Sequence, residues 1–203
     1  MFFATASLVA KGFGLMGGDY LNEPMLLCED VEAVSCSGCL TVVQKNSGEV
    51  SCYGYNPYGQ CGVDPEQTES KIGKEFVHYL NPMMTLPPSK AIDTGLQHVI
   101  SLSRDGEVYT WGKGGNGQLG NAEAAYSHVP VMVDLPNKCT KIAAGFAHSA
   151  AICEDGNLYI WGKGCSDKKI GEKEQGRDWT LFLAGSANAS LACSEVYSSE
   201  IRG

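Results

Sequence analysis

Two histidines occupy the same place in two similar stretches of the chain, where they could ligate a metal ion or act as a general base. His98 lies three residues after Gly95, and His148 lies three residues after Gly145. Histidines at equivalent repeat positions are more often structural, because each can bond the backbone of a neighbouring repeat. No Ser-His-Asp or paired-carboxylate arrangement stands out at a spacing that supports catalysis. The sequence therefore predicts no catalytic residues and a structural role for both histidines.

Cysteines are the second group that could bind a metal ion. The chain has nine, and Cys36 and Cys39 form a Cys-x-x-Cys pair followed by Cys52 and Cys61. A structural zinc site needs two close pairs or a pair of histidines, and only one such pair exists here. In the repeats described below, Cys36, Cys52, Cys61 and Cys153 take positions that small or apolar residues fill in other copies. We therefore predict no metal ion, and reduced thiols packed in the core, as in a cytosol-like compartment.

Glycine-rich stretches could cradle a dinucleotide phosphate. Residues 112–117 read Gly-x-Gly-x-x-Gly after an expected strand, and residues 12–17 repeat the pattern. A dinucleotide site also needs a helix that opens at the glycines and an acidic residue about 20 positions later. The chain after residue 117 leads to Pro130 without a helical period. We predict that these glycines form loops and bind no cofactor.

The segment around these glycines is expected to be a β-hairpin. Apolar residues alternate along 99–103, which is the period of a strand with one buried face. Asp105 and Gly106 follow, and this pair favours a tight turn because such turns need a positive φ. Residues 108–111 make the return strand, and the glycine-rich loop 112–120 excludes a helix.

The hairpin recurs, at intervals of 50 and 58 residues. In the third copy the Asp-Gly turn is residues 155–156 and the Trp-Gly pair is residues 161–162, whereas the first copy has Ser-Gly at 47–48 and Tyr-Gly at 53–54. A unit of this length cannot bury its own hydrophobic faces, so neighbouring units must stack. The aromatic ends of the hairpins favour radial stacking as propeller blades.

We therefore predict an all-β fold: a β-propeller of four-stranded antiparallel blades, about four in number, forming a single propeller domain or arc. Five approximate units are expected, with partial ones at both ends: 1–30, 31–86, 87–137, 138–180 and 181–203. The longer connection 63–88 is expected to contain a short amphipathic helix near residues 71–80.

These repeats resemble the regulator of chromosome condensation family. Its signature combines Gly-x-x-His, a hairpin ending in Trp-Gly, and a Gly-Gln-Leu-Gly loop. The structural repeat residues are Gly95, His98, Trp111, Gly112, Gly117, Gln118, Gly120, Gly145, His148, Trp161 and Gly162. The first copy departs from the signature, with Ser37 and Leu40 in place of glycine and histidine. The resemblance implies a seven-bladed propeller, so the chain is part of a larger protein, or another chain completes the ring, or the arc stays open.

Composition limits the partners. The net charge of −8 argues against nucleic acid bound through a basic surface, and no apolar run approaches the 18 residues of a membrane span. The N-terminus lacks the basic region of a secretory signal. We expect an intracellular protein, in the cytoplasm or in a cytoskeletal or organellar complex, that is not secreted.

The function expected from these features is a non-enzymatic protein-interaction module or scaffold that docks into a larger intracellular assembly. The alternative, implied by the resemblance, is a guanine-nucleotide exchange factor for a Ran-like small GTPase. The candidate partner contacts are Asp64, Glu66, Lys71, Lys74, Phe76 and Tyr79.

Overall fold

The computed structural model describes most of the chain and shows a nearly all-β protein. The described residues are 8–12, 15–16, 19–20, 25–67, 76–121, 125–163 and 179–183. Within them the sole helical element is a 3₁₀ turn, η1, at Pro65–Gln67. No helix in this part of the chain is long and apolar enough to cross a bilayer.

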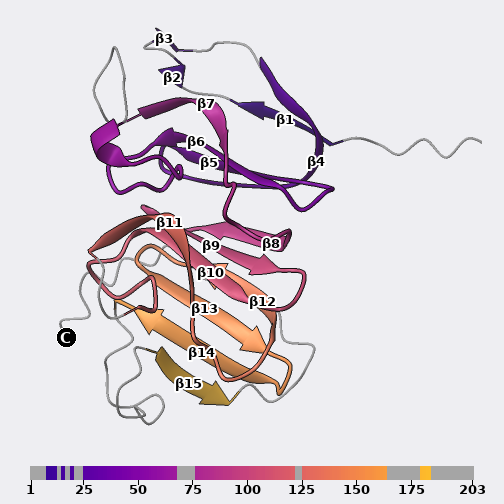
Figure 1. Ribbon diagram of the computed structural model, residues 1–203, viewed down its shortest axis with the longest axis vertical. Helices are drawn as coiled ribbons and strands as arrows, with labels where there is room; N and C mark the ends of the chain where they lie inside the picture. The colour runs from indigo at the N-terminus through magenta and orange to yellow at the C-terminus, as the bar shows by residue number, and fades with distance from the viewer. Residues whose placement is uncertain are drawn as a thin grey trace, which may run out of the picture.

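The strands form three antiparallel sheets that follow one another along the long axis of the molecule (Figure 1). The first sheet has the order β1-β4-β5-β6-β7, with β1 at Leu8–Gly12, β4 at Met25–Ser37, β5 at Leu40–Lys45, β6 at Val50–Tyr55 and β7 at Phe76–Pro82. The second has the order β8-β9-β10-β11, with β8 at Ser89–Thr94, β9 at His98–Ser103, β10 at Val108–Lys113 and β11 at Tyr126–Met132. The third has the order β12-β13-β14-β15, with β12 at Cys139–Ala144, β13 at His148–Cys153, β14 at Asn157–Gly162 and β15 at Trp179–Leu183. A small separate pair joins β2, Leu15–Met16, to β3, Asp19–Tyr20. This architecture confirms the predicted fold class.

The long strand β4 serves two neighbours. Its N-terminal half pairs with β1, where Ala10 lies opposite Cys28, and its C-terminal half pairs with β5, where Val34 lies opposite Val43. The first sheet therefore has five strands, and the other two have four each.

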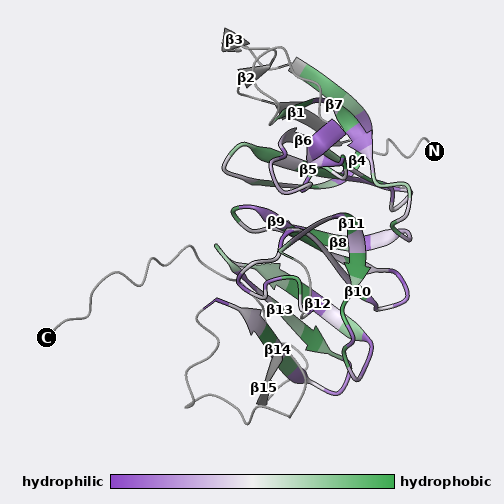
Figure 2. Cartoon of the chain, turned by 60° about the vertical axis from the view of Figure 1, so that its left-hand side comes forward, coloured by the Kyte–Doolittle hydropathy of each residue, from purple (hydrophilic) through white to green (hydrophobic). Residues whose placement is uncertain are grey.

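The hairpin turn between β9 and β10 forms at Asp105-Gly106, where the sequence places it. Val108 lies opposite Leu102 across the turn, and the Gly106 N–H donates to the Ser103 carbonyl at 3.1 Å. Gly106 has φ +81°, which a residue with a side chain rarely adopts. Hydrophilic residues concentrate at such turns, while hydrophobic residues follow the strands (Figure 2).

The expectation that β9 buries one face is wrong, because all six of its residues are buried. The second sheet lies between the other two, so both of its faces are covered. Val99 packs with Leu40 of the first sheet, and Ile100 packs with Ala151 of the third. The alternation in this strand therefore separates two interfaces. Buried hydroxyl groups on it bond within the second sheet: Ser101 bonds Ser89 of β8 at 2.6 Å.

Two hydrophobic clusters join the three sheets. Between the first and second sheets the buried residues are Leu40, Val42, Val50, Cys52, Cys61, Val77, Met83, Val99 and Trp111. Between the second and third they are Ile100, Leu102, Val108, Val133, Cys139, Ala144, Ala151, Cys153, Tyr159 and Trp161. Burial of these side chains supplies the main driving force for stacking. A single sheet could not bury its apolar faces alone.

The expected helix near residues 71–80 is also wrong where the structure describes it. Residues 76–82 form strand β7, in which Phe76 lies opposite Tyr55 and Val77 opposite Gly54. Residues 71–75 lie outside the described residues. A short segment with mixed apolar and polar residues fits both periods, and pairing with β6 decides between them.

Candidate interaction site

The tryptophans that end the hairpins link neighbouring sheets. The Trp111 indole N–H donates to the Gln60 carbonyl of the first sheet at 2.9 Å, and the Trp161 indole N–H donates to the Gln118 carbonyl of the second at 2.9 Å. Both indoles are fully buried. The Gly-Gln-x-Gly loop of one sheet therefore supplies the acceptor for the tryptophan of the next.

The glutamine side chains hold these loops in shape. The Gln60 amide oxygen accepts the backbone N–H of Tyr58, and the Gln118 amide oxygen accepts that of Asn116, each at 2.9 Å. Gly117 donates to the carbonyl of Gly114 at 2.8 Å. The glycine-rich stretch thus forms consecutive turns stabilised within the loop.

Gly112 and Gly162, which follow the tryptophans, have φ values of +96° and +108°. A Cβ at Gly112 would lie 2.6 Å from the Gln97 carbonyl oxygen, and one at Gly162 would lie 2.6 Å from that of Ala147. Only glycine fits this conformation and this close backbone approach.

His98 joins the second sheet to the third. Its Nε2 lies 3.0 Å from the Ser149 hydroxyl, which donates to the Gln118 carbonyl at 2.9 Å, so Nε2–H is the donor to Ser149. The ring lies against Gly95, where a Cβ would meet it. Complete burial, with a smaller effect of His148, lowers the pKa of His98 to about 4, so the ring is neutral at pH 7.

His148 takes the equivalent place in the third sheet, over Gly145. It is half-buried, and burial lowers its pKa. No group of three or more His, Cys, Asp or Glu side chains that could hold a metal ion occurs in the described ranges. His98 Nε2 is bonded within the protein, and the complete burial of the ring keeps it out of contact with solvent.

Asp93 is a linking residue that sequence reasoning missed. Its carboxylate accepts the Ser35 hydroxyl at 3.1 Å from the first sheet and the Ala144 N–H at 2.8 Å from the third. It therefore joins β4, β8 and β12, one strand from each of the three sheets. The sequence showed only an acidic residue at this position, and that does not indicate which groups its carboxylate would bond.

The cysteines divide into two groups. All seven described cysteines are free, and Cys52, Cys61, Cys139 and Cys153 are buried. Cys28 is half-buried, but Cys36 and Cys39 are exposed, so the expectation of a core position for Cys36 is wrong. Cys36 lies opposite Thr41, on the face of the first sheet that is turned away from the second.

The candidate partner contacts lie near the loop that joins β6 to β7. Asp64, which directly precedes η1, accepts the Glu66 N–H at 3.0 Å, and Glu66 is exposed. Phe76 packs against Tyr55, with ring centroids 5.3 Å apart. Tyr79 is 59% exposed on β7. Lys71 and Lys74 lie outside the described residues.

Tyr79 is one of several large apolar side chains exposed along the outermost strands. β7 and β11 end the first and second sheets. The exposed large apolar residues on these two strands, and just after β7 in the case of Met84, are Tyr79, Met84, Tyr126, Val129 and Met132. We call these five residues the outer-strand surface. Exposed apolar side chains on strands that end a sheet are available for contact with a partner protein.

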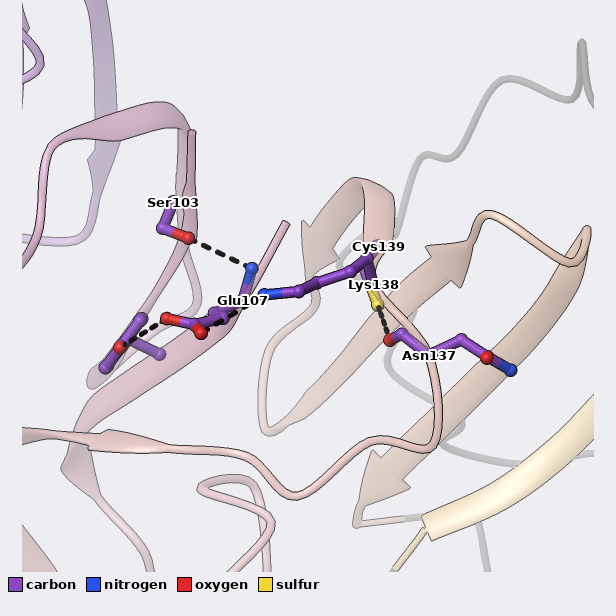
Figure 3. Close-up of polar contacts among 6 residues, drawn as sticks. Ser103, Glu107, Asn137, Lys138 and Cys139 are labelled. Atoms are coloured by element: carbon purple, nitrogen blue, oxygen red, sulfur yellow. Dashed lines mark hydrogen bonds and ion pairs between the residues drawn. The ribbon is translucent and has the colours of Figure 1, made fainter. Parts of the chain in front are cut away.

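A cleft of about 390 Å³ lies between the second and third sheets, at the end where the β9–β10 and β13–β14 turns meet the connection from β11 to β12. Lys138 reaches across it to Glu107, with Nζ 3.2 Å from Oε1 (Figure 3). The Tyr109 hydroxyl donates to the other Glu107 oxygen at 2.9 Å. These two donors lower the pKa of Glu107, so its carboxylate stays ionised.

Comparison with known proteins identifies these repeats. The regulator of chromosome condensation (RCC1) repeat matches residues 105–152, and a second description of the same repeat matches residues 90–118 and 139–166. The chain contains RCC1-type repeats. The hydrogen bond from the Trp161 indole to the Gln118 carbonyl is therefore a contact between neighbouring RCC1 repeats in this chain.

Relatives of this RCC1-repeat chain have diverse names. It is 31% identical over 121 residues to the mouse regulator of chromosome condensation, covering 58% of this chain and 27% of that protein. It is also 31% identical over 114 residues to the mouse serine/threonine-protein kinase Nek9, covering 56% of this chain and 11% of the kinase. The chain thus spans well under two thirds of these relatives.

Solved structures show the same fold. Human WBSCR16 has a TM-score of 0.71 at 23% identity, covering 93% of this chain and 51% of that chain. Prp20p of Saccharomyces cerevisiae, studied with its binding to Gsp1p and histones, has a TM-score of 0.68 at 19% identity, covering 90% and 48%. The chain spans about half of each propeller.

Proposed function

We propose that this chain is a non-enzymatic protein-interaction module that docks into a larger intracellular assembly. The observation that carries the proposal is the outer-strand surface, where Tyr79 and Val129 are 59% and 44% exposed on strands that end their sheets. Such a surface gains free energy when a partner covers it, at about 25 cal/mol per Å² of apolar area.

The bonding of the repeat residues supports the same proposal. His98, Trp111 and Trp161 make buried hydrogen bonds to neighbouring sheets. These hydrogen bonds hold the arc together, and we assign the interaction role to the surfaces of the arc. A second chain whose sheets complete the ring would be one partner of this kind.

The experiment compares the affinity-tagged chain with a Tyr79→Ser/Val129→Ser double variant by size-exclusion chromatography of cell extracts. We expect the wild type to elute in a complex and the double variant to elute near the 21.6 kDa of the free chain. Val34→Ser is the matched control, because Val34 is 53% exposed on β4, away from the outer strands. Co-elution of both variants with the wild type would contradict the proposal.

Guanine-nucleotide exchange on a Ran-like small GTPase is the second candidate. It is favoured by the 31% identity to the mouse regulator of chromosome condensation. Release of a fluorescent guanine nucleotide from a panel of small GTPases tests it, with and without the chain. Acceleration would support exchange, and unchanged release rates would remove it.

A further inference from the structure

Three residues hold the same position in the three hairpin turns, and they differ in charge. Asn46, Arg104 and Glu154 each precede the two-residue turn of their sheet. The backbone N–H of each donates to a carbonyl within β4 or directly before β8 or β12: those of Asp30, Pro88 and Lys138, at 2.9, 2.9 and 2.8 Å respectively. The backbones are thus equivalent, and the side chains distinguish the junctions.

At the junction of the first and second sheets, the chain uses an arginine to join the two turns. The Arg104 guanidinium extends back to the first sheet and donates from Nη2 to the Asn46 carbonyl at 2.8 Å. At the junction of the second and third sheets the equivalent side chain is Glu154. A carboxylate cannot donate a hydrogen bond, so Glu154 cannot form this link to the turn before it.

The cleft described above lies at this second junction, and Glu154 lines it. Its apolar lining includes Val108, Val133 and Leu135, and Met132 is 54% exposed beside them. Its volume of about 390 Å³ falls within the range of about 300–1,000 Å³ that ligand pockets have.

The charged lining of the cleft is mainly acidic. Glu107, Asp134 and Glu154 contribute carboxylates, and Lys138 is the one basic residue among the lining residues. Lys138 is engaged by Glu107, as Figure 3 shows. A cationic side chain with an apolar stem fits both the acidic rim and the apolar lining.

We propose that the cleft between the second and third sheets binds an arginine-containing basic segment of a partner protein, whose guanidinium takes the place that Arg104 holds at the first junction. The planar guanidinium can donate to both oxygens of a carboxylate together, which an ammonium does with less directional fit. The inference rests on the proposed interaction role and names the chemistry of one contact.

The test uses the full chain and a fluorescein-labelled peptide, Gly-Ser-Leu-Arg-Gly-Leu-Arg-Ser-Gly, followed by fluorescence anisotropy. A second peptide carries citrulline at both arginines, which keeps the shape and removes the charge. We expect the citrulline peptide to bind about tenfold more weakly. Added salt should weaken binding of the arginine peptide.

Two variants at one position separate charge from shape. Glu154→Gln should weaken binding of the arginine peptide about fivefold. Glu154→Arg should abolish it, because the chain then supplies its own guanidinium, as at the first junction. Glu49→Gln is the matched control for Glu154→Gln: Glu49 pairs with Lys45 at 2.8 Å in the first sheet, so the net charge changes by the same single unit while the cleft is untouched. Circular dichroism and thermal unfolding confirm that each variant is folded.

Equal binding of the two peptides, equal binding by wild type and Glu154→Arg, or no binding to the folded wild type at millimolar peptide would overturn the inference. These failures are distinct from failure of the proposed function. If the peptide does not bind but the Tyr79→Ser/Val129→Ser variant still elutes as the free chain, the cleft inference alone is wrong. If the peptide binds while the chain migrates alone in extracts, the assembly role is wrong and the cleft assignment stands.

Discussion

Replacement of Gly112 by alanine tests the structural basis of the stacked arc. Gly112 has φ +96°, and an added Cβ would lie 2.6 Å from the Gln97 carbonyl oxygen and 2.9 Å from the His98 Cα. Both neighbours are backbone atoms, so they cannot rotate away. A strained φ costs about 1–3 kcal/mol, and overpacking costs a further 1–3 kcal/mol or so. We expect Gly112→Ala to lower the free energy of unfolding by about 2–6 kcal/mol.

The same loop offers a matched control. Gly115 is exposed, and a Cβ there would come no nearer than 3.9 Å to the Ala125 carbonyl oxygen. Gly115→Ala should change the free energy of unfolding by less than about 0.5 kcal/mol. Urea denaturation followed by the fluorescence of the buried tryptophans measures both variants. A loss below about 1 kcal/mol for Gly112→Ala, or equal losses for the two variants, would refute the reasoning.

Three further predictions concern buried polar groups and thiols. Ser149→Ala leaves the His98 Nε2–H without its acceptor, and should lower the free energy of unfolding by about 1–3 kcal/mol in urea denaturation. Because the pKa of His98 falls from 6.5 to about 4 on folding, the unfolded chain binds the proton first as the pH drops. The stability due to the neutral ring is complete above pH 6.5 and should decline toward pH 4 by up to about 3 kcal/mol; a His98→Gln variant should lack this component of the pH profile. In alkylation followed by mass spectrometry, Cys36 and Cys39 should react before Cys52, because burial raises the Cys52 pKa; faster labelling of Cys52 would contradict its burial.

The repeated hairpins could be predicted from sequence because their signals are local. Gly106 and Gly156 have φ values of +81° and +79°, as the tight turns require. Trp111 and Trp161 share one register position, and both bond a glutamine carbonyl of the preceding sheet. A repeat with a constant register transfers each local rule from one copy to the next.

The features that sequence reasoning missed depend on contacts between distant segments. Asp93 binds partners 58 and 51 residues away, at Ser35 and Ala144, and no local pattern names either. The exposure of Cys36 follows from its place on the outward face of the first sheet. Strand β7 forms through pairing with β6, although its sequence also fits a short helix.

The cleft could not be predicted for a related reason. It arises where a turn of the second sheet, the connection after β11 and the turn of the third sheet converge. The substitution of Glu154 at the place of Arg104 was visible in the aligned repeats. Its meaning became clear only with the bond from Arg104 to the Asn46 carbonyl, which shows what an arginine does there.

Native mass spectrometry of the chain, isolated by an affinity tag under gentle conditions, tests the interaction role most directly. We predict a species heavier than 21.6 kDa that contains at least one other polypeptide and dissociates when Tyr79 and Val129 are replaced by serine. A single species at 21.6 kDa, with no bound polypeptide, would contradict it.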